Sequence, residues 1–257
     1  MGVVRAAVLA AGRGVRMGGG TPKTLLQIGP HAPLLFYILE GIKRAGIDDL
    51  LVVTGHRAAE VEDYVEKEWS GTAAFVRNMR YASWGNFHSV RVALDQSPGH
   101  DVLVVNSDVI VQPDVYRRTA DAFGDLVLAV QKREDLDNED MRVELSGNRI
   151  LDIGKNLRMS RSHAEYAGVS LIRSEAARHF KDLSTELEWQ GTTGIYYEDV
   201  YRAMLDRTTA RGVAVRAGTY AEVDEPVDQE AALAVIESHL GDWGGETALS
   251  GAAGTAT

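Results

Sequence analysis

The stretch Val8–Gly29, VLAAGRGVRMGGGTPKTLLQIG, joins a short apolar strand to a loop rich in glycine and positive charge. Glycines allow sharp turns and let the backbone approach a ligand closely, and successive backbone N–H groups in such loops form concave anion-binding sites. Arg13, Arg16 and Lys23 add cationic donors, and arginine suits bidentate contact with phosphate. The stretch therefore predicts a cradle for a polyphosphate directly after the first strand.

This loop fits neither of two common phosphate-binding motifs. It lacks the Gly-Lys-Ser/Thr of the P-loop, and no helix opens directly after its glycines as the dinucleotide fingerprint requires. The alternative is a flexible surface loop with solvated cations. The position after a buried strand and the ending in Pro22-Lys23 favour the cradle.

The composition excludes several classes of protein. The chain has 257 residues, a net charge of −10 and no cysteine, so disulfides, zinc–thiolate sites and cysteine nucleophiles are excluded. Such an acidic chain has no general attraction for nucleic acid or anionic membranes. It has no apolar run of the roughly 20 residues that span a bilayer and no signal-peptide pattern. We therefore expect a cytoplasmic protein without nucleic-acid or membrane partners, and its oligomeric state stays open, a homodimer included.

Strands and helices alternate through the first half of the chain. Apolar strands are predicted at residues 3–9, 50–55, 73–78 and 101–108, and helices at 33–45, 58–68, 86–96 and 113–123. Continuous apolar strands separated by helices indicate a parallel sheet covered on both faces. The first half therefore predicts an α/β fold.

The pattern changes in the second half. It predicts strands at 126–132, 165–172 and 213–224, a hairpin at 141–156 turning at 146–148, and helices at 174–180, 197–205 and 226–240. The chain contains no internal repeat and no linker, which favours one domain over residues 1–240. Residues 241–257 are small, glycine-rich and unpatterned, and are expected to form a disordered tail.

The opening stretch resembles the signature of nucleotidyltransferases that act on sugar phosphates and related alcohol phosphates. That signature is Leu-Ala-Ala-Gly-x-Gly-x-Arg-Met, a short variable segment, then Pro-Lys-x-Leu-Leu, and every fixed position is met. The resemblance implies a Rossmann-like nucleotide-diphospho-sugar transferase fold of GT-A type, with a mostly parallel central sheet and helices on both faces. It implies that Arg16 and Lys23 hold the triphosphate as catalytic residues. It assigns the rest of the nucleotide site to Leu9, Ala10, Ala11, Gly12, Arg13 and Gly14.

The resemblance also requires carboxylates for a metal ion. Asp108, in VVNSDVIV, ends a buried parallel strand, on the edge where such sheets bind ligands. In YAEVDEPVDQEAA, which resembles the closing motif of the family, Glu222 and Asp224 are two residues apart on a strand and point to one side. The resemblance implies that Asp108, Glu222 and Asp224 hold Mg²⁺, which prefers a few carboxylates plus phosphate oxygens. The neighbouring Ser107 is a nucleotide contact and a weaker candidate ligand, as is Asn106, and Asp228 is expected in the first turn of the last helix.

A third segment indicates the branch of the family. NMRYASWGNFHSVRVAL, residues 78–94, resembles the Asn-x-x-Tyr…Asn-Asn-x-x-Ser motif of the phosphocholine cytidylyltransferases and their relatives acting on aminoethylphosphonate. Gly85 stands where asparagine is usual. The matching residues, implied to lie near the cytosine and sugar of CTP, are Asn78, Tyr81, Asn86 and Ser89.

The acceptor site is expected in the second half, where EYAGVSLI and GIYYEDVYRAML resemble corresponding segments of that group. Lys155, after the hairpin, stands where relatives hold a lysine near the reacting phosphates and is a catalytic candidate. The acceptor-binding candidates are Trp84, Tyr166, Gly168, Tyr197 and Glu198, with Tyr196, Asp199 and Trp189 as further pocket candidates. Aromatic and acidic side chains suit an ammonium group. The alternative is a core stripe, because Tyr197, Val200, Tyr201 and Leu205 have helical spacing.

These observations together predict a Mg²⁺-dependent cytidylyltransferase that transfers CMP from CTP and releases pyrophosphate. The acceptor is a small alcohol phosphate or phosphonate, such as phosphocholine, aminoethylphosphonate, hydroxyethylphosphonate or a cyclitol phosphate. Two alternatives remain: a sugar-1-phosphate or cyclitol-phosphate nucleotidyltransferase using another triphosphate, and a catalytically silent nucleotide-sensing subunit.

Overall fold

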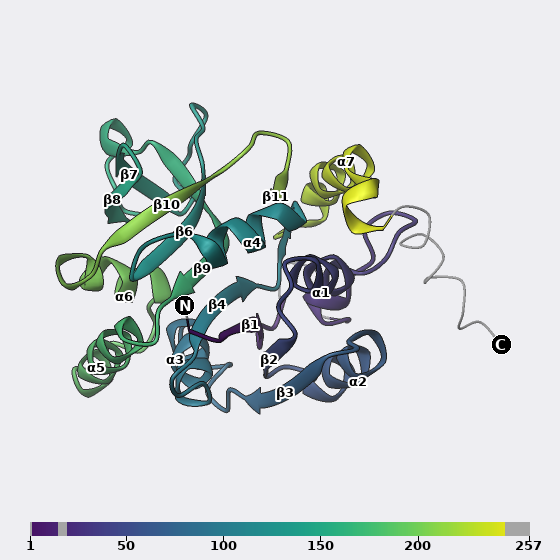
Figure 1. The fold of residues 1–257 in the computed structure, drawn as a ribbon, viewed down its shortest axis with the longest axis horizontal. Coiled ribbons are helices and arrows are strands. Elements are labelled where there is room, and N and C mark those ends of the chain that lie inside the picture. Colours follow the sequence, from purple (N-terminus) through teal and green to yellow (C-terminus); the bar gives the residue numbers. More distant parts are fainter. Residues whose placement is uncertain (1, 15–19, 245–257) are drawn as a thin grey trace.

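A central mixed sheet organises the molecule (Figure 1). The computed structural model describes residues 2–14 and 20–244. Within these residues the sheet has nine strands in the order β3-β2-β1-β4-β9-β6-β10-β8-β7. The strands are β1 (Val4–Ala10), β2 (Asp49–Thr54), β3 (Thr72–Arg77), β4 (Asp101–Asn106), β6 (Leu126–Gln131), β7 (Arg142–Ser146), β8 (Arg149–Ile153), β9 (Ala164–Ile172) and β10 (Ala210–Val215). Seven of them run in one direction, and β8 and β9 run in the other.

Helices cover both faces of this sheet, as expected from the alternation of strands and helices along the chain. The α-helices are α1 (Leu34–Arg44), α2 (Ala58–Glu68), α3 (Phe87–Asp95), α4 (Pro113–Asp121), α5 (Ala176–Trp189), α6 (Tyr197–Met204) and α7 (Gln229–Ser238). The short 3₁₀ helices are η2 (Lys23–Leu25), η3 (Met159–Arg161), η4 (Leu205–Arg207), η5 (Pro226–Asp228) and η6 (Leu240–Trp243). Along β1, Ala7 and Leu9 pack toward α3, α5 and α6, whereas Ala6 and Val8 pack toward α1, α2 and α4.

The predicted elements of the first half are all present, and its strands β3, β2, β1 and β4 are parallel as expected. The sheet then becomes antiparallel, because β9 inserts between β4 and β6 and runs against both. The hairpin predicted at 141–156 forms as β7 and β8. The helix predicted at 174–180 is longer than expected and continues to Trp189.

The single strand predicted at 213–224 is wrong, and the correction matters for the site. The chain leaves the main sheet after Val215, turns at Gly218 with a φ of +75°, and forms the separate strand β11 (Tyr220–Glu222). Strand β11 pairs antiparallel with β5 (Val109–Val111) in a two-stranded sheet. The strand predicted at 101–108 similarly ends at Asn106, so that a turn at residues 107 and 108 precedes β5.

The C-terminal boundary also differs from the prediction. Residues 241–244 were expected in a disordered tail, but η6 extends through Trp243, whose side chain is buried. The indole packs edge-on against Tyr37 of α1, with ring centroids 5.5 Å apart. Burial of this large aromatic group fixes the segment. No helix among residues 2–14 and 20–244 is long and apolar enough to cross a membrane.

Candidate active site

Two adjoining clefts lie at the C-terminal edge of β1 and β4. The loop cleft, about 380 Å³, is lined by Leu9, Ala10, Ala11, Gly12, Arg13, Gly14, Pro22, Lys23, Thr24, Asn86, Ser89, Asn106, Ser107, Asp108 and Asp224. The acidic cleft, about 750 Å³, is lined among others by Gln131, Arg133, Lys155, Tyr166, Gly168, Tyr196, Glu198, Tyr220 and Glu222. Asn86, Asn106, Asp108 and Asp224 line both clefts. These four residues mark the junction.

The loop after β1 forms one wall of the loop cleft, as the sequence predicted. Gly14 has a φ of +55°, and a Cβ atom there would lie 2.9 Å from the Cβ of Lys23. Glycine therefore lets the loop close against η2. The loop is also tied to β2, because the N–H of His56 donates to the carbonyl oxygen of Ala11 at 3.2 Å. Arg16, the second predicted phosphate ligand of this loop, lies outside the described residues.

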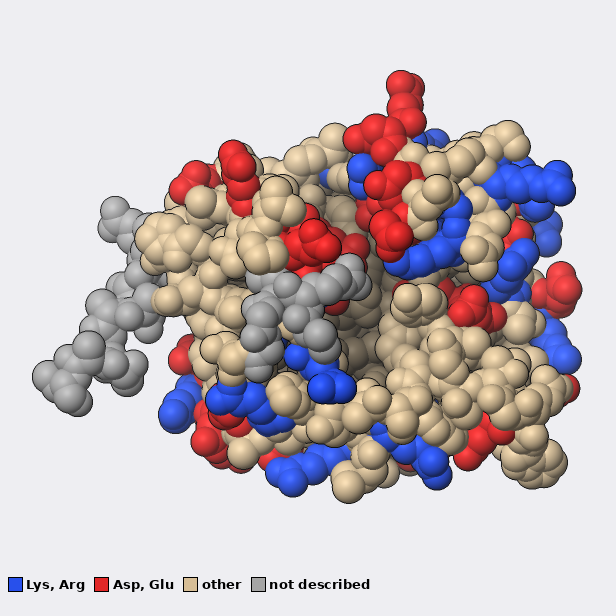
Figure 2. Space-filling view, turned by 180° about the vertical axis from the view of Figure 1, so that it is seen from behind, with Lys and Arg blue, Asp and Glu red and all other residues tan. Residues whose placement is uncertain are grey.

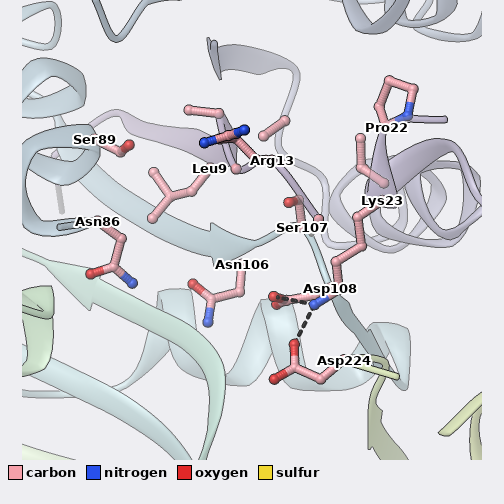
Figure 3. A pocket seen from close by; sticks show the side chains of 15 residues that line it. Leu9, Arg13, Pro22, Lys23, Asn86, Ser89, Asn106, Ser107, Asp108 and Asp224 are labelled. Carbon is pink, nitrogen blue, oxygen red and sulfur yellow. Dashed lines mark hydrogen bonds and ion pairs between the residues drawn. The ribbon is translucent and has the colours of Figure 1, made fainter. Parts of the chain in front are cut away.

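The Lys23 ammonium group joins two carboxylates from distant parts of the chain (Figure 3). It donates to Asp108 Oδ2 at 3.0 Å and to Asp224 Oδ1. Asp108 comes from the turn before β5 and Asp224 follows β11, so the pairing of β5 with β11 brings them together. The N–H of Val223 donates to the carbonyl oxygen of Asp108 at 2.8 Å. Asp228, at the start of the last helix as predicted, accepts from the backbone of Asp224 at 2.8 Å.

The three predicted metal ligands are brought together. One carboxylate oxygen from each of Asp108, Glu222 and Asp224 lies within 4.8 Å of the other two. Asp108 Oδ1 is buried and has no hydrogen-bond partner within the described chain, which leaves a ligand atom available. An all-oxygen set of carboxylates at the end of a phosphate-binding loop fits Mg²⁺ better than softer metals. The residues present therefore fit the predicted magnesium ion.

The surroundings of the junction shift the pKa values of Lys23 and Glu222. Burial acts to lower the pKa of Lys23, but the charges and hydrogen bonds of Asp108 and Asp224 outweigh it and raise that pKa. Glu222 keeps exposed surface as a residue, yet desolvation of its carboxyl group, together with the charges of Asp108 and Asp224, raises its pKa to about 8. Even with Glu222 protonated, the two aspartates outnumber the one ammonium group, and a divalent cation would neutralise the excess negative charge.

The acidic cleft is named for its lining. Among its described lining residues, ten carboxylate side chains face two cationic ones, Arg133 and Lys155. Arg133 donates to Glu165 at 2.6 Å, and Lys155 lies 3.4 Å from Glu139. Figure 2 shows Asp and Glu side chains gathered along one rim of a central hollow. The cleft therefore favours a bound group that carries positive charge or hydrogen-bond donors.

Glu198 and Glu165 are the two most buried carboxylates among the described residues of the acidic cleft. Glu165 is paired with Arg133, whereas Glu198 has no such ion pair among these residues. Glu198 is only 4% exposed, and its Oε2 atom is buried without a hydrogen-bond partner among the described residues. Burial raises the pKa of Glu198 to about 8. Because a buried acceptor without a partner is costly, this atom is suited to accept a hydrogen bond from a ligand in the cleft.

The predicted cytosine-side residues divide into two groups. Asn86 and Ser89, at the start of α3, line the loop cleft. Asn78 is buried and lies behind them, donating from Nδ2 to Ser89 Oγ at 2.9 Å and accepting from the backbone of Arg80. Asn78 and Tyr81 line a separate pocket of about 340 Å³ beside Gly55. Asn78 therefore supports the wall of the loop cleft and does not form its surface.

Two further predicted acceptor residues do not reach either cleft. Trp84 stacks on Phe87 with ring centroids 5.9 Å apart, beneath the guanidinium group of Arg80. Trp189 is 86% exposed at the end of α5. Glycine stands at position 85, where the motif usually has asparagine, for a steric reason. A Cβ atom there would lie 1.8 Å from the carbonyl oxygen of Ile195.

The tyrosines of α6 belong mainly to the core, as predicted by the alternative that their helical spacing forms a core stripe. Tyr197, Val200 and Tyr201 are fully buried in the cluster between α5, α6 and the sheet, and Leu205 packs against it. Tyr197 lines neither cleft, although its hydroxyl group donates to Asn106 Oδ1 at 2.8 Å. Asp199 caps α6 by accepting from the Tyr196 N–H at 2.9 Å. Of the aromatic pocket candidates, Trp84, Trp189 and Tyr197 therefore do not line the acidic cleft, whereas Tyr166 and Tyr196 do.

Several residues of the junction and the acidic cleft were weak candidates or were missed when only the sequence was considered. Asn106 was only a weak candidate metal ligand, although its position at the end of β4 was a usable signal. The sequence pattern does not predict that the acidic cleft is lined by Gln131, Arg133 and Glu165. These residues reach the cleft because of the strand order β4-β9-β6, which periodicity does not reveal. Tyr220 reaches the cleft through the unexpected strand β11.

Comparison with known proteins identifies relatives of this arrangement. The chain is 32% identical over 230 residues to a bifunctional IPC transferase and DIPP synthase from Rubrobacter xylanophilus, which covers 88% of this chain and 50% of that protein. It is 34% identical over 125 residues to a CMP-5'-(3-aminopropyl)phosphonate synthase from Streptomyces rubellomurinus, covering 46% of this chain and 19% of that protein. The chain thus spans about half, or less, of the length of these curated relatives.

Solved structures share the fold. The inositol-1-phosphate CTP transferase from T. maritima superposes with a TM-score of 0.77 at 21% identity, covering 91% of this chain and 96% of that one. The CTP:phosphocholine cytidylyltransferase from Streptococcus pneumoniae gives a TM-score of 0.74 at 23% identity, with 88% and 96% coverage. These likenesses confirm the predicted α/β nucleotide-diphospho-sugar transferase fold. Residues 6–191 match the MobA-like NTP transferase domain, and the chain therefore belongs to this nucleotidyltransferase family.

Proposed function

We propose that the protein is a Mg²⁺-dependent cytidylyltransferase that transfers CMP from CTP to a small phosphate or phosphonate. The observation that carries this proposal is the meeting of Lys23, Asp108 and Asp224 where the loop cleft joins the acidic cleft. A triphosphate lying along the glycine-rich loop would bring its phosphates to this junction. An acceptor entering from the acidic cleft would reach the same point.

The proposed reaction needs no general base. An acceptor phosphate oxygen, already ionised near neutral pH, forms a bond to the α-phosphorus while the bond to the bridging oxygen of pyrophosphate breaks. Lys23, together with Arg16, would neutralise the negative charge that develops on the departing pyrophosphate. Asp108, Glu222 and Asp224 would hold Mg²⁺, which when bound supplies further neutralisation of phosphate charge. Catalysis is then positioning plus charge stabilisation.

The choice of CTP rests on relatives and on the loop cleft. A phosphonate relative is named as a CMP conjugate synthase, and two structural neighbours are named as CTP-dependent enzymes. The base would lie against the backbone of Ala10–Gly12 and the side chains of Asn86 and Ser89, which line one cleft. The alternative of a different triphosphate keeps the same phosphate site and changes only the base contacts.

The acidic cleft favours acceptors whose far end carries an ammonium group or several hydroxyl groups. Glu198 offers a buried, unpartnered oxygen atom there, and Tyr166 and Tyr196 contribute aromatic surface. Lys155, on the rim beside Glu139, would orient the acceptor phosphate. Phosphocholine and aminoethylphosphonate carry an ammonium group at the far end, and a cyclitol phosphate carries several hydroxyl groups. Hydroxyethylphosphonate has a single hydroxyl group and fits this pattern less well. A sugar 1-phosphate is the competing acceptor.

The test is a matrix of substrates. The purified chain is incubated with Mg²⁺, each of the four triphosphates and each acceptor, and pyrophosphate release and the mass of the nucleotide adduct are measured. We expect CMP adducts, abolished in Asp108→Asn. Turnover with purine triphosphates alone would contradict the choice of CTP. Absence of any adduct, combined with tight nucleotide binding, would favour the nucleotide-sensing alternative.

A further inference from the structure

Asn106 occupies the junction from the sheet side. It is the last residue of β4, two positions before Asp108, and it lines both the loop cleft and the acidic cleft. Figure 3 shows its side chain between those of Asn86 and Asp108. A polar group at this point faces the place where the α-phosphate and the acceptor phosphate would meet.

One end of the Asn106 amide is held from the protein core. Its Oδ1 atom accepts a hydrogen bond of 2.8 Å from the hydroxyl group of Tyr197. That hydroxyl group lies 3.1 Å from the Tyr166 hydroxyl group, and the network continues to Ser170 at 3.0 Å and from there to Tyr201 at 2.8 Å. Tyr197 is fully buried, so its hydroxyl group is held beside Asn106 Oδ1 at the base of the junction.

Packing restricts the amide on its other side. Gly168 has a φ of +73°, and a Cβ atom there would lie 3.1 Å from Asn106 Cβ and 3.2 Å from Asn106 Nδ2. A residue with a side chain would therefore push against the amide. Gly168, which was predicted to bind the acceptor substrate, lines the acidic cleft and packs directly against Asn106.

The other end of the amide remains available to a ligand. An asparagine amide carries one acceptor oxygen and two N–H donors on its nitrogen. With Oδ1 bound to Tyr197, Nδ2 has no hydrogen-bond acceptor among residues 2–14 and 20–244. A neutral donor beside Asp108 and Asp224 can bind a phosphate oxygen without the ion pairing that engages Lys23.

We propose that Asn106 donates from Nδ2 to a phosphate oxygen at the reacting centre, and that Tyr197 is the positioning residue that keeps Nδ2 turned toward the clefts. This inference rests on the proposed nucleotidyl transfer and adds the group that contacts the α-phosphate. Without the Tyr197 hydroxyl group, the amide can rotate and present its oxygen to the phosphate. Because the contact strengthens as charge develops on the phosphate oxygens, its loss lowers kcat more than it raises KM.

Four variants test the inference: Asn106→Ala, Tyr197→Phe, the double variant, and Tyr201→Phe as the matched control. Tyr201→Phe removes a hydroxyl group from the same buried network, but one that contacts Ser170 and not Asn106. We expect kcat to fall about 100-fold in Asn106→Ala and about tenfold in Tyr197→Phe, the range of single oxyanion donors and their supports. Tyr201→Phe should change kcat less than about twofold, because it leaves the contact intact.

Three outcomes would overturn the inference. Equal losses of kcat in Tyr197→Phe and Tyr201→Phe, at matched melting temperatures, would make the network merely structural. If the fold-decreases in kcat of the two single variants multiply in the double variant, Tyr197 does not act through Asn106. Wild-type kcat in Asn106→Ala would exclude the phosphate contact.

Calorimetric titration with CTP and Mg²⁺ separates this inference from the proposed function. If the wild-type protein forms no adduct with any substrate pair, the proposed function is contradicted, but the proposed contact of Asn106 with a phosphate is not. In that case Asn106→Ala must still weaken the Kd for CTP by about threefold, the loss of one neutral hydrogen bond. An unchanged Kd would then overturn the contact.

Discussion

The Nζ atom of Lys23 lies 3.0 Å from Oδ2 of Asp108, across 85 positions of the chain. The same ammonium group bonds to Asp224, so one lysine ties the glycine-rich loop to both strands of the β5–β11 pair, at the end where β5 begins and β11 ends. The atoms it contacts belong to the residues that would hold a metal ion. Lys23 is therefore the counter-ion of two carboxylates at the junction.

Lys23→Met should abolish most of the activity and weaken the fold. Removal of the ammonium group leaves three carboxylates without their counter-ion, which we expect to cost roughly 1–2 kcal/mol, less than a fully buried pair because the site is partly solvated. The kcat/KM for the triphosphate should fall by about 100-fold or more. Urea denaturation and pyrophosphate release measure the two effects. The matched control is Lys67→Met, on the exposed side of α2, which should match wild type in both; an active Lys23→Met would contradict the assigned role.

Asp108→Asn should remove the metal site and leave the fold intact. One carboxylate oxygen from each of Asp108, Glu222 and Asp224 lies within 4.8 Å of the other two, and an amide is a poorer ligand for a hard divalent cation. We expect Mn²⁺ affinity, measured by electron paramagnetic resonance in the presence of CTP, to fall by about tenfold or more. Asp121→Asn, at the exposed end of α4, is the control. Equal Mn²⁺ affinity in the two variants would place the metal elsewhere.

The sequence predicts most of the fold because its strong signals are local. The apolar strands that became β1, β2, β3 and β4 and the helices between them are read from periodicity, and they carry Gly12, Asn86 and Asp108 to one edge of a parallel sheet. The glycine-rich loop follows from its residue types and its position after the first strand, and the role of its lysine is implied by the resemblance to the family signature. For this half of the site, local pattern and tertiary position agree.

The second half was less predictable because its positions depend on strand order. Periodicity does not show that β9 runs backwards between β4 and β6, or that the chain leaves the sheet after Val215 to form β11. Trp84 and Tyr197 illustrate the consequence, since both were expected in a ligand pocket and both pack into the core cluster around α3 and α6. Helical spacing shows which side chains share one face of a helix, but it does not show whether that face packs against protein or against a ligand.

Gly168→Ala should damage both stability and activity. The residue has a φ of +73°, and the added methyl group would meet Val109 Cγ1 at 2.8 Å as well as Asn106. Backbone strain alone costs about 1–2 kcal/mol for a left-handed residue, and displacement of Asn106 should lower kcat. Gly191→Ala is the control, because Gly191 has a φ of +74° with nothing within 4 Å of a Cβ atom. If both variants lose the same stability and neither loses kcat, crowding at Asn106 has no functional effect.

Glu198→Gln should stabilise the protein in alkaline solution. Burial raises the pKa of Glu198 from 4.5 to about 8, so between these values the unfolded chain has released a proton that the folded chain retains. The stability of the wild type relative to the glutamine variant therefore falls as pH rises from about 4.5 to about 8, and then stays constant. Below about pH 4.5 both states of the wild type are protonated and the difference vanishes.

Urea denaturation of wild type and Glu198→Gln at about pH 5 and about pH 9 measures this linkage, with an expected gap on the order of a few kcal/mol at the higher pH. Glu66→Gln, on the exposed side of α2, is the control and should show no such gap. Phosphocholine added at the higher pH should narrow the gap, because its ammonium group would favour the ionised carboxylate of the wild type. A gap that is independent of pH would mean that the free energy comes from packing and not from the charge on Glu198.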